Sequence, residues 1–237
     1  MDNTEKLKKK LDELAKDASF IIVNPETLEK LKSKGIPIES KFITYKEYLN
    51  KLFDEKRKIA DEIIKNFPPI SEKLANASVK SLYEEVRECY ALGLFGATIT
   101  LSVILLELSF KYKIYSEREK SDPSARWEEI EKLDFTTSVK NLKNLGKITE
   151  PEKKELDKFN TEIRNPYIHY NLRKLVNGVF VEKMPMIDTA TGEVKTLENI
   201  DVSKHLYLWF SGKKFRDKRE VDGILQFCIG WMNKILG

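Results

Sequence analysis

Residues 162–171 read Glu-Ile-Arg-Asn-Pro-Tyr-Ile-His-Tyr-Asn, and the rest of the chain is best understood outward from this segment. It places a permanent cation, Arg164, beside an amide, Asn165, and a few residues before His169, one of only two histidines in the chain. The residue before a proline is disfavoured in the α conformation, so we expect one helix to end near Asn165 and another to begin at Pro166. Arg164 and His169 would then flank a helix–helix junction, where side chains can converge.

The segments on both sides of this junction have helical patterns. Thr149 and Glu152 have the spacing of a capping box, and Pro151 suits a first helical turn. This pattern predicts a helix over residues 149–163, followed by a second helix from Pro166. The apolar residues at helical spacing are Leu156, Phe159 and Ile163 in the first helix and Ile168, Leu172 and Leu175 in the second.

The side chains at the junction suit phosphodiester transfer without a metal or cofactor. The guanidinium of Arg164 stays protonated and can stabilise charge that develops on phosphate oxygens. The imidazole of His169 can move a proton near neutral pH, and Asn165 can orient a hydroxyl or a phosphate oxygen. An RNA 2′-hydroxyl could be the attacking group, which would leave a cyclic phosphate.

The segment from Arg164 to His169 resembles the motif of HEPN domains, in which an Arg, often followed by Asn, precedes a His by four to six intervening residues. These domains are all-helical, and many are metal-independent endoribonucleases of toxin–antitoxin or antiviral systems. The resemblance covers roughly residues 75–177. It implies that Glu107 and Lys111, on an earlier long helix, face the same site. One toxin subfamily has a tyrosine two residues after the histidine, where this chain has Asn171.

The resemblance therefore implies an endoribonuclease that acts as a toxin or antiviral defence effector, with RNA as its partner. An antitoxin or other regulatory protein is a further candidate partner. Proton transfer needs a base and an acid, and the motif supplies a single histidine, so we expect a homodimer with a composite active site. The alternative is a non-catalytic HEPN-type module that binds RNA, nucleotide or a partner protein. In that case Arg164 caps its helix and His169 packs inside the bundle.

Aromatic and basic residues elsewhere are candidates for substrate binding. Tyr167 and Tyr170 could stack on bases, or line a helix interface instead. The basic run over residues 213–219 is predicted to be a loop, either solvated or holding single-stranded RNA. Its candidate binding residues are Lys213, Lys214, Phe215 and Arg216.

The fold class predicted is mainly α, a HEPN-like helical bundle around a long apolar central helix at residues 79–115. The stretch from Cys89 to Leu106 carries no charge and is near the length of a membrane span. Its small and polar residues and the adjacent Glu107 favour a buried central helix instead. A buried carboxylate needs a partner, and Lys111 or Arg164 could serve.

We expect two regions, with the boundary at Pro68-Pro69. Residues 1–70 would be an N-terminal helical extension, which includes an amphipathic helix over residues 4–18. Residues 71–237 would be the HEPN-like domain, with a β-hairpin at about 178–210 and a final apolar-faced helix. Within that hairpin region, residues 204–210 alternate in a way that suggests a strand.

Composition is consistent with these expectations without identifying a function. The chain has 237 residues, a net charge of +4 and two cysteines. A mildly basic balance is compatible with nucleic-acid binding, and so few cysteines exclude a disulfide scaffold. The first ten residues are rich in charge and lack the pattern of a secretory signal, so we expect a cytoplasmic protein.

Overall fold

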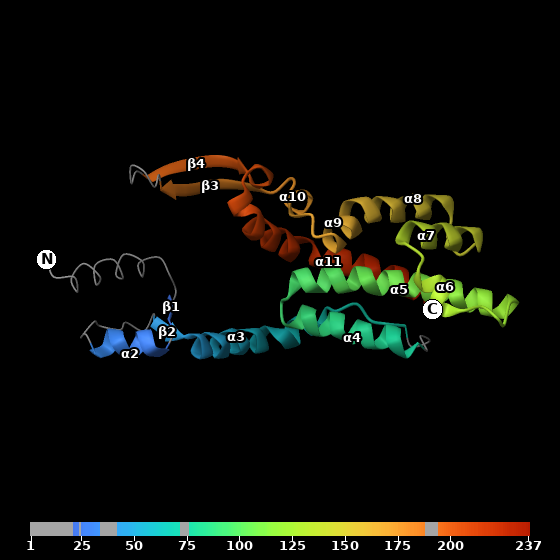
Figure 1. Cartoon of the computed structure of the whole chain (residues 1–237), viewed down its shortest axis with the longest axis horizontal. Helices are drawn as coiled ribbons and strands as arrows, with labels where there is room; N and C mark the ends of the chain where they lie inside the picture. Colours follow the sequence, from blue (N-terminus) through green and yellow to red (C-terminus); the bar gives the residue numbers. More distant parts are fainter. Residues whose placement is uncertain (1–20, 24, 34–41, 72–75, 188–193) are drawn as a thin grey trace. The chain divides into compact units, whose positions relative to one another are not determined.

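The computed structural model of the chain describes residues 21–23, 25–33, 42–71, 76–187 and 194–237 (Figure 1). The described part is mostly helical, which confirms the mainly α fold. The contacts divide the chain into two units, residues 1–62 and 63–237. The predicted helix over residues 4–18 lies outside the described residues.

The first unit pairs two short parallel strands, β1 (Ile21–Val23) and β2 (Phe42–Thr44), with helix α2 (Pro25–Ser33) between them in the chain. Helix α3 (Tyr45–Lys65) begins at a capping box, because Thr44 and Glu47 exchange hydrogen bonds as their spacing predicts. The division between the units lies inside α3, a little before the predicted boundary at Pro68-Pro69.

The second unit is a helical bundle with one hairpin, and its core lies along the apolar helix α5. Helix α11 packs along α5, and α4 and α7 also contact it (Figure 1). The helices of this unit are α4 (Ala77–Ala91), α5 (Phe95–Ser121), α6 (Trp127–Glu131), α7 (Phe135–Asn144), α8 (Glu150–Phe159), α9 (Asn165–Ile168), α10 (Leu172–Leu175) and α11 (Trp209–Leu236).

The prediction of one continuous helix over residues 79–115 is wrong, because the chain breaks between α4 and α5. Gly93 has a φ of 65° and donates its N–H to the carbonyl of Tyr90, and Leu94 donates to Cys89. These two bonds form a Schellman motif, which needs a residue in the left-handed conformation and therefore favours glycine. The apolar residues that suggested one long span thus belong to two helices.

Helix α5 by itself is long and apolar enough to cross a membrane, and it is the one such helix in the described part of the chain. Within the second unit it lies against α4, α7 and α11, and Ile99, Val103 and Phe110 are fully buried. These contacts agree with the expected buried central helix.

The predicted helix break before Pro166 is also wrong. Helix α8, a π-helical turn over Asn160–Arg164 and helix α9 follow one another without interruption. In the π turn the N–H of Asn165 bonds to the carbonyl of Asn160, five residues back. This wider turn tolerates a proline, whose missing N–H would leave a gap in the regular α-helical ladder.

The helical segment ends at Tyr170 instead of Asn165. Tyr170 has a φ of 49°, and Asn171 donates to the carbonyl of Pro166 in another Schellman arrangement. Asn171 then caps the short helix α10, where its side chain accepts from the N–H of Lys174. The second predicted helix is therefore two short pieces separated by a left-handed tyrosine.

The β-hairpin is present, with antiparallel strands β3 (Phe180–Ile187) and β4 (Val194–Asp201). The predicted strand at residues 204–210 and the predicted basic loop at 213–219 are both wrong. Residues 202–208 form two 3₁₀ turns, and the basic run belongs to α11. Its cations pair with carboxylates one turn away along the helix, a spacing that suits a helix better than a loop.

Candidate functional site

The carboxylate of Glu107 on α5 joins two cations from different parts of the chain. Its Oε2 atom accepts from Nη2 of Arg164 at 3.0 Å, and its Oε1 atom lies 3.1 Å from Nζ of Lys111. The three side chains, here called the Glu107 cluster, are 15–17% exposed. Two cations share one carboxylate, so the cluster has a net charge of +1 and can attract an anion.

Arg164 is held in a fixed orientation within this cluster. Its Nη1 atom donates to Oδ1 of Asn165 at 2.9 Å, and the guanidinium carbon lies 6.0 Å from the ring centre of Phe135. Its Nε atom is buried and has no hydrogen-bond partner in the described part of the protein. The alternative interpretation expected Arg164 to cap its own helix, and the structure does not show this. Arg164 extends to the neighbouring helix α5.

The two cations of the Glu107 cluster act electrostatically on Asp134, at the start of α7. Asp134 caps this helix by accepting from the N–H of Thr137. Hydrogen bonds from Thr137 lower the pKa of Asp134, and the charges of Arg164 and Lys111 lower it further. An anionic group is thus stabilised in this neighbourhood.

His169 lies on a different side of the same helix and is exposed to solvent. Five residues along an α-helix correspond to a rotation of about 500°, so His169 and Arg164 point about 140° apart around the axis. Within the described residues, the imidazole forms no hydrogen bond or ion pair. The expectation that His169 packs inside the bundle is wrong, because the residue is exposed. The helix–helix junction expected between Arg164 and His169 is absent at Asn165, because the helix continues through Pro166.

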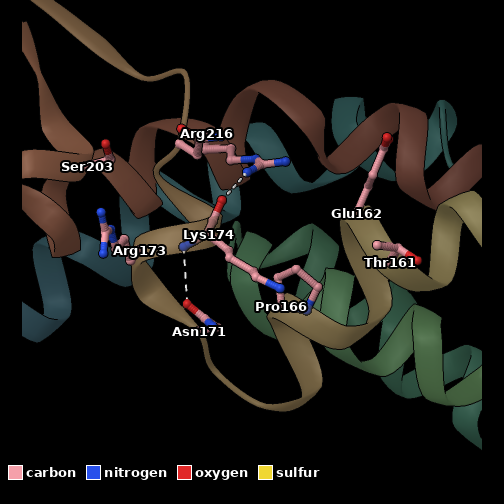
Figure 2. Close-up of a pocket in the computed structure, with 9 residues that line it drawn as sticks. Thr161, Glu162, Pro166, Asn171, Arg173, Lys174, Ser203 and Arg216 are labelled. Carbon is pink, nitrogen blue, oxygen red and sulfur yellow. Dashed lines mark hydrogen bonds between the residues drawn. The ribbon is translucent and has the colours of Figure 1, made fainter.

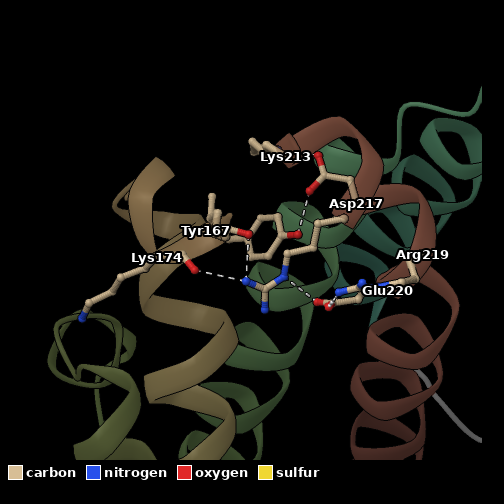
Figure 3. A network of polar contacts seen from close by, with 8 residues as sticks. Tyr167, Lys174, Lys213, Asp217, Arg219 and Glu220 are labelled. Atoms are coloured by element: carbon tan, nitrogen blue, oxygen red, sulfur yellow. Dashed lines mark hydrogen bonds and ion pairs between the residues drawn. The ribbon is translucent and has the colours of Figure 1, made fainter. Parts of the chain in front are cut away.

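A second polar group, the Asp217 cluster, consists of Tyr167, Lys213 and Asp217 (Figure 3). The hydroxyl of Tyr167 donates to Oδ1 of Asp217 at 2.7 Å, and Lys213 pairs with Oδ2 of the same carboxylate. Gly96 on α5 leaves space for this pair, because a Cβ atom there would lie 2.7 Å from Oδ2 of Asp217. The cluster therefore binds α9 to α11 in the interior.

The Asp217 cluster is more deeply buried than the Glu107 cluster. The side chains of Lys213 and Asp217 are 11% and 8% exposed. Burial and the hydrogen bond to Asp217 raise the pKa of Tyr167 far above its usual range, so the phenol stays protonated. The ammonium of Lys213 also lies 5.7 Å from the ring centre of Tyr170, the residue after His169, which is itself exposed.

Arg216 extends this network toward α10. Its Nε atom donates to Glu220, and its Nη1 atom donates to the carbonyls of Lys174 and Leu175 at 3.1 and 2.8 Å. Burial by itself would raise the pKa of Glu220, but hydrogen bonds from Arg216 and Arg219 outweigh it and lower that pKa. Arg216 thus connects α11 to the segment that follows the motif.

The structure divides the predicted site residues into three sets. Glu107, Lys111, Arg164 and Asn165 contact one another, as the resemblance implied. Tyr167 and Lys213 belong to the neighbouring Asp217 cluster, so Tyr167 lines a helix interface, and the exposed ring of Tyr170 lies beside Lys213. Lys214 and Phe215 are exposed on α11, away from the contacts of both clusters in the described residues.

The sequence interpretation did not single out the partners Asp217 and Glu220. Each follows a cation by four residues, Lys213 and Arg216 respectively, which is the spacing of an ion pair on one face of a helix. The run had been interpreted as a loop, and helical spacing was therefore not considered.

An open pocket of about 770 Å³ lies on the outer side of α9 and α10 (Figure 2). Its lining is polar and carries three cations, Arg173, Lys174 and Arg216, against one carboxylate, Glu162. The remaining lining residues are Thr161, Pro166, Asn171, Asn177 and Ser203. None of the cations except Arg216 had been considered from the sequence.

Among the residues that the structure describes, no group of three His, Cys, Asp or Glu side chains is placed to hold a metal ion. Comparisons with protein-family models, curated proteins and solved structures found no match to this chain. The functional argument therefore depends on the geometry of the chain itself.

Proposed function

We propose that this protein is a metal-independent endoribonuclease, acting as a toxin or defence effector. The observation that supports the proposal is the Glu107 cluster, in which one carboxylate orients a guanidinium and leaves a net positive charge. An arginine oriented in this way can stabilise the charge that develops on phosphate oxygens during cleavage.

His169 would supply the proton transfer. Its imidazole is exposed and unengaged within the described residues, so it can approach a bound strand. The imidazole would remove the proton from a ribose 2′-hydroxyl, whose oxygen attacks the adjacent phosphorus. The bond from phosphorus to the 5′-oxygen then breaks, leaving a 2′,3′-cyclic phosphate and a 5′-hydroxyl once that oxygen gains a proton.

A second copy of the chain would supply the acid for the leaving oxygen. His169 and Arg164 point to different sides of one helix, so a single chain does not bring its own pair together. A two-fold dimer can place one copy's His169 near the other copy's Glu107 cluster. The surface of α5 beside Glu107 suits such a contact, because it has an apolar stripe at helical spacing. In the stripe Ala97 and Ile104 are exposed, Ile104 by 41%, whereas Leu101 and Leu108 are half-buried against the core of the same chain.

A non-catalytic binding module is the second candidate, and one observation favours it. The guanidinium of Arg164 already bonds to Glu107 and Asn165, so it holds α9 against α5 whether or not an RNA is cut. Under this alternative, the purified protein binds RNA, nucleotide or a partner protein but never cleaves RNA. Substitutions at Arg164 and His169 then change affinity only.

The decisive experiment incubates purified protein with a mixed RNA pool, with and without EDTA. Cleavage should persist in EDTA, and His169→Ala should reduce its rate by at least about 100-fold, the contribution expected of a general acid or base. His205→Ala is the matched control, because it removes the other histidine of the chain, and it should cleave normally. Binding without any cleavage by the wild type would favour the non-catalytic module instead.

Two further variants test the arginine and the dimer. Arg164→Lys keeps the positive charge next to Glu107 but removes the planar fork, so we expect a folded protein with greatly reduced cleavage. Ile104→Glu places a charge in the apolar stripe of α5 and should give a monomer that cleaves poorly, as measured by sedimentation and by RNA cleavage. Full activity from a stable monomer would rule out the composite site.

A further inference from the structure

We infer that the pocket beside α9 and α10 binds the phosphate groups of an RNA strand and contributes affinity that does not depend on base sequence. This inference depends on the proposed function for the identity of its ligand. It concerns a surface separate from the Glu107 cluster, since neither Glu107 nor Arg164 lines the pocket (Figure 2).

The cations of the pocket are available to a ligand. Arg173 and Lys174 are exposed, and within the described residues neither side chain has a hydrogen bond or ion pair. Arg216 is held by Glu220 through Nε and by two backbone carbonyls through Nη1, which leaves its Nη2 atom without a hydrogen-bond partner in the same part of the chain. A fixed guanidinium next to two free cations suits a chain of phosphates.

The rest of the lining favours the backbone of a strand over its bases. The pocket includes the amides of Asn171 and Asn177, which can donate to phosphate oxygens or ribose hydroxyls. The hydroxyls of Thr161 and Ser203 also line it, but their protons already donate to the carbonyl of Asp157 and to the carboxylate of Asp201. It contains no aromatic side chain among its lining residues, and base recognition in single strands depends largely on aromatic stacking. The predicted affinity is therefore electrostatic and insensitive to sequence.

The spacing of residues along the helix relates the pocket to the proposed general base, His169, which is not itself a lining residue. Glu162 and Pro166 line the pocket, and His169 follows them at the spacing of one helix face, four and then three residues on. A strand held in the pocket would thus pass the exposed imidazole. The single pocket carboxylate, Glu162, lies 4.0 Å from Lys158 of α8, which reduces its repulsion of phosphate.

The test measures binding of a fluorescent RNA 12-mer whose 2′-hydroxyls are all methylated, so that 2′-oxygen attack is impossible. The double variant Arg173→Ala/Lys174→Ala should bind about ten-fold more weakly than wild type, with a salt dependence smaller by about two phosphate contacts. The control is Arg118→Ala/Lys140→Ala, which removes the same charges from exposed positions outside the pocket and should bind like wild type. Two oligomers of unrelated sequence should give the same result.

Several outcomes would overturn the inference. Equal losses in the pocket and control variants would mean that general charge, and not the pocket, provides the affinity. A loss confined to one sequence would mean base recognition. Full competition by a free mononucleotide, at an affinity equal to that of the oligomer, would mean a nucleotide site and not a strand site.

The result separates this inference from the proposed nuclease activity. If the wild type cleaves RNA while the pocket variant binds normally, the pocket inference fails and the nuclease stands. If the pocket variant loses binding while unmodified RNA is never cut, the nuclease fails and the pocket stands. Both variants replace exposed side chains, and matching circular dichroism and melting curves would establish that the fold is intact.

Discussion

The Glu107 cluster and the Asp217 cluster flank the same short helix but differ in net charge. In the Glu107 cluster one carboxylate faces two cations, Lys111 and Arg164, whereas in the Asp217 cluster one carboxylate faces one cation, Lys213, and a neutral phenol. The neutral cluster is also the more buried of the two. The difference indicates that Asp217 fixes α9 to α11 through a neutral pair, while the Glu107 cluster carries one excess cation close to the carboxylate of Asp134.

The largest stability effect is expected at Asp217. Asp217→Ala leaves the buried ammonium of Lys213 and the hydroxyl of Tyr167 unpaired, so the free energy of unfolding should fall by about 3–5 kcal/mol. Chemical denaturation measures it. As a control, Glu84→Ala breaks an exposed ion pair with Arg87 and should cost less than about 1 kcal/mol. If Asp217→Ala lowered the free energy of unfolding no more than this control does, Asp217 would not fix α9 to α11.

A smaller loss is expected at Glu107. Glu107→Gln keeps an acceptor for Arg164 but leaves two cations without a counter-charge, in a more exposed site, and should lower the free energy of unfolding by about 2 kcal/mol. The same variant raises the net charge of the cluster to +2. Chemical denaturation of Glu107→Gln and Asp217→Ala under the same conditions compares the two losses directly. The distinction between the clusters would fail if Glu107→Gln proved the more destabilising.

Two of the left-handed helix ends, Gly146 after α7 and Tyr170 after α9, should respond in opposite directions. Gly146→Ala introduces a Cβ at a φ of 65° with nothing within 4 Å, so backbone strain alone should cost about 1 kcal/mol. Tyr170→Gly relieves the same strain at a φ of 49° but loses the contact with Lys213, so we expect a gain of about 0.5 kcal/mol. Melting temperatures of both variants measure this. A large loss at Tyr170 would mean that the aromatic contact fixes the end of α9.

The smallest effect concerns pH. The folded protein lowers the pKa of Glu220, so this group stabilises the fold above its unfolded pKa of about 4.5, and that stability is lost as pH falls below this value. In Glu220→Gln the free energy of unfolding should therefore fall less steeply between about pH 5 and about pH 3, the range in which carboxylates titrate. Denaturation midpoints across this range test it, and an unchanged slope would remove Glu220 from the network around Arg216.

Local signals in the sequence predicted much of the fold. The capping boxes at Thr44 and Thr149 are present as expected, since each depends only on residues three apart. The hairpin and the apolar face of α11 follow from short-range patterns in the same way. The break at Gly93 was missed because apolar composition continues across it, although the left-handed glycine ends the helix.

The candidate site was predictable in part. The spacing of Glu107 and Lys111 on one helix suggested their ion pair, and the structure contains it. The relation between Arg164 and His169 was not predictable, because a π turn carries the helix through Pro166 and holds the two side chains on different sides. The sequence did not identify Arg173 and Lys174 as pocket residues, since exposed cations next to a motif are common.

The sequence alone determined that the fold is mainly α, that helices with capping signals begin at Thr44 and Thr149, and that an apolar helix forms the centre. These features depend on backbone conformation and on side chains within one or two turns. Only the tertiary structure decided that Arg164 meets Glu107 and that Tyr167 meets Asp217, in pairs 57 and 50 residues apart. Periodicity tells which face of a helix is buried, but the partner of a buried charge is chosen by the packing of whole helices.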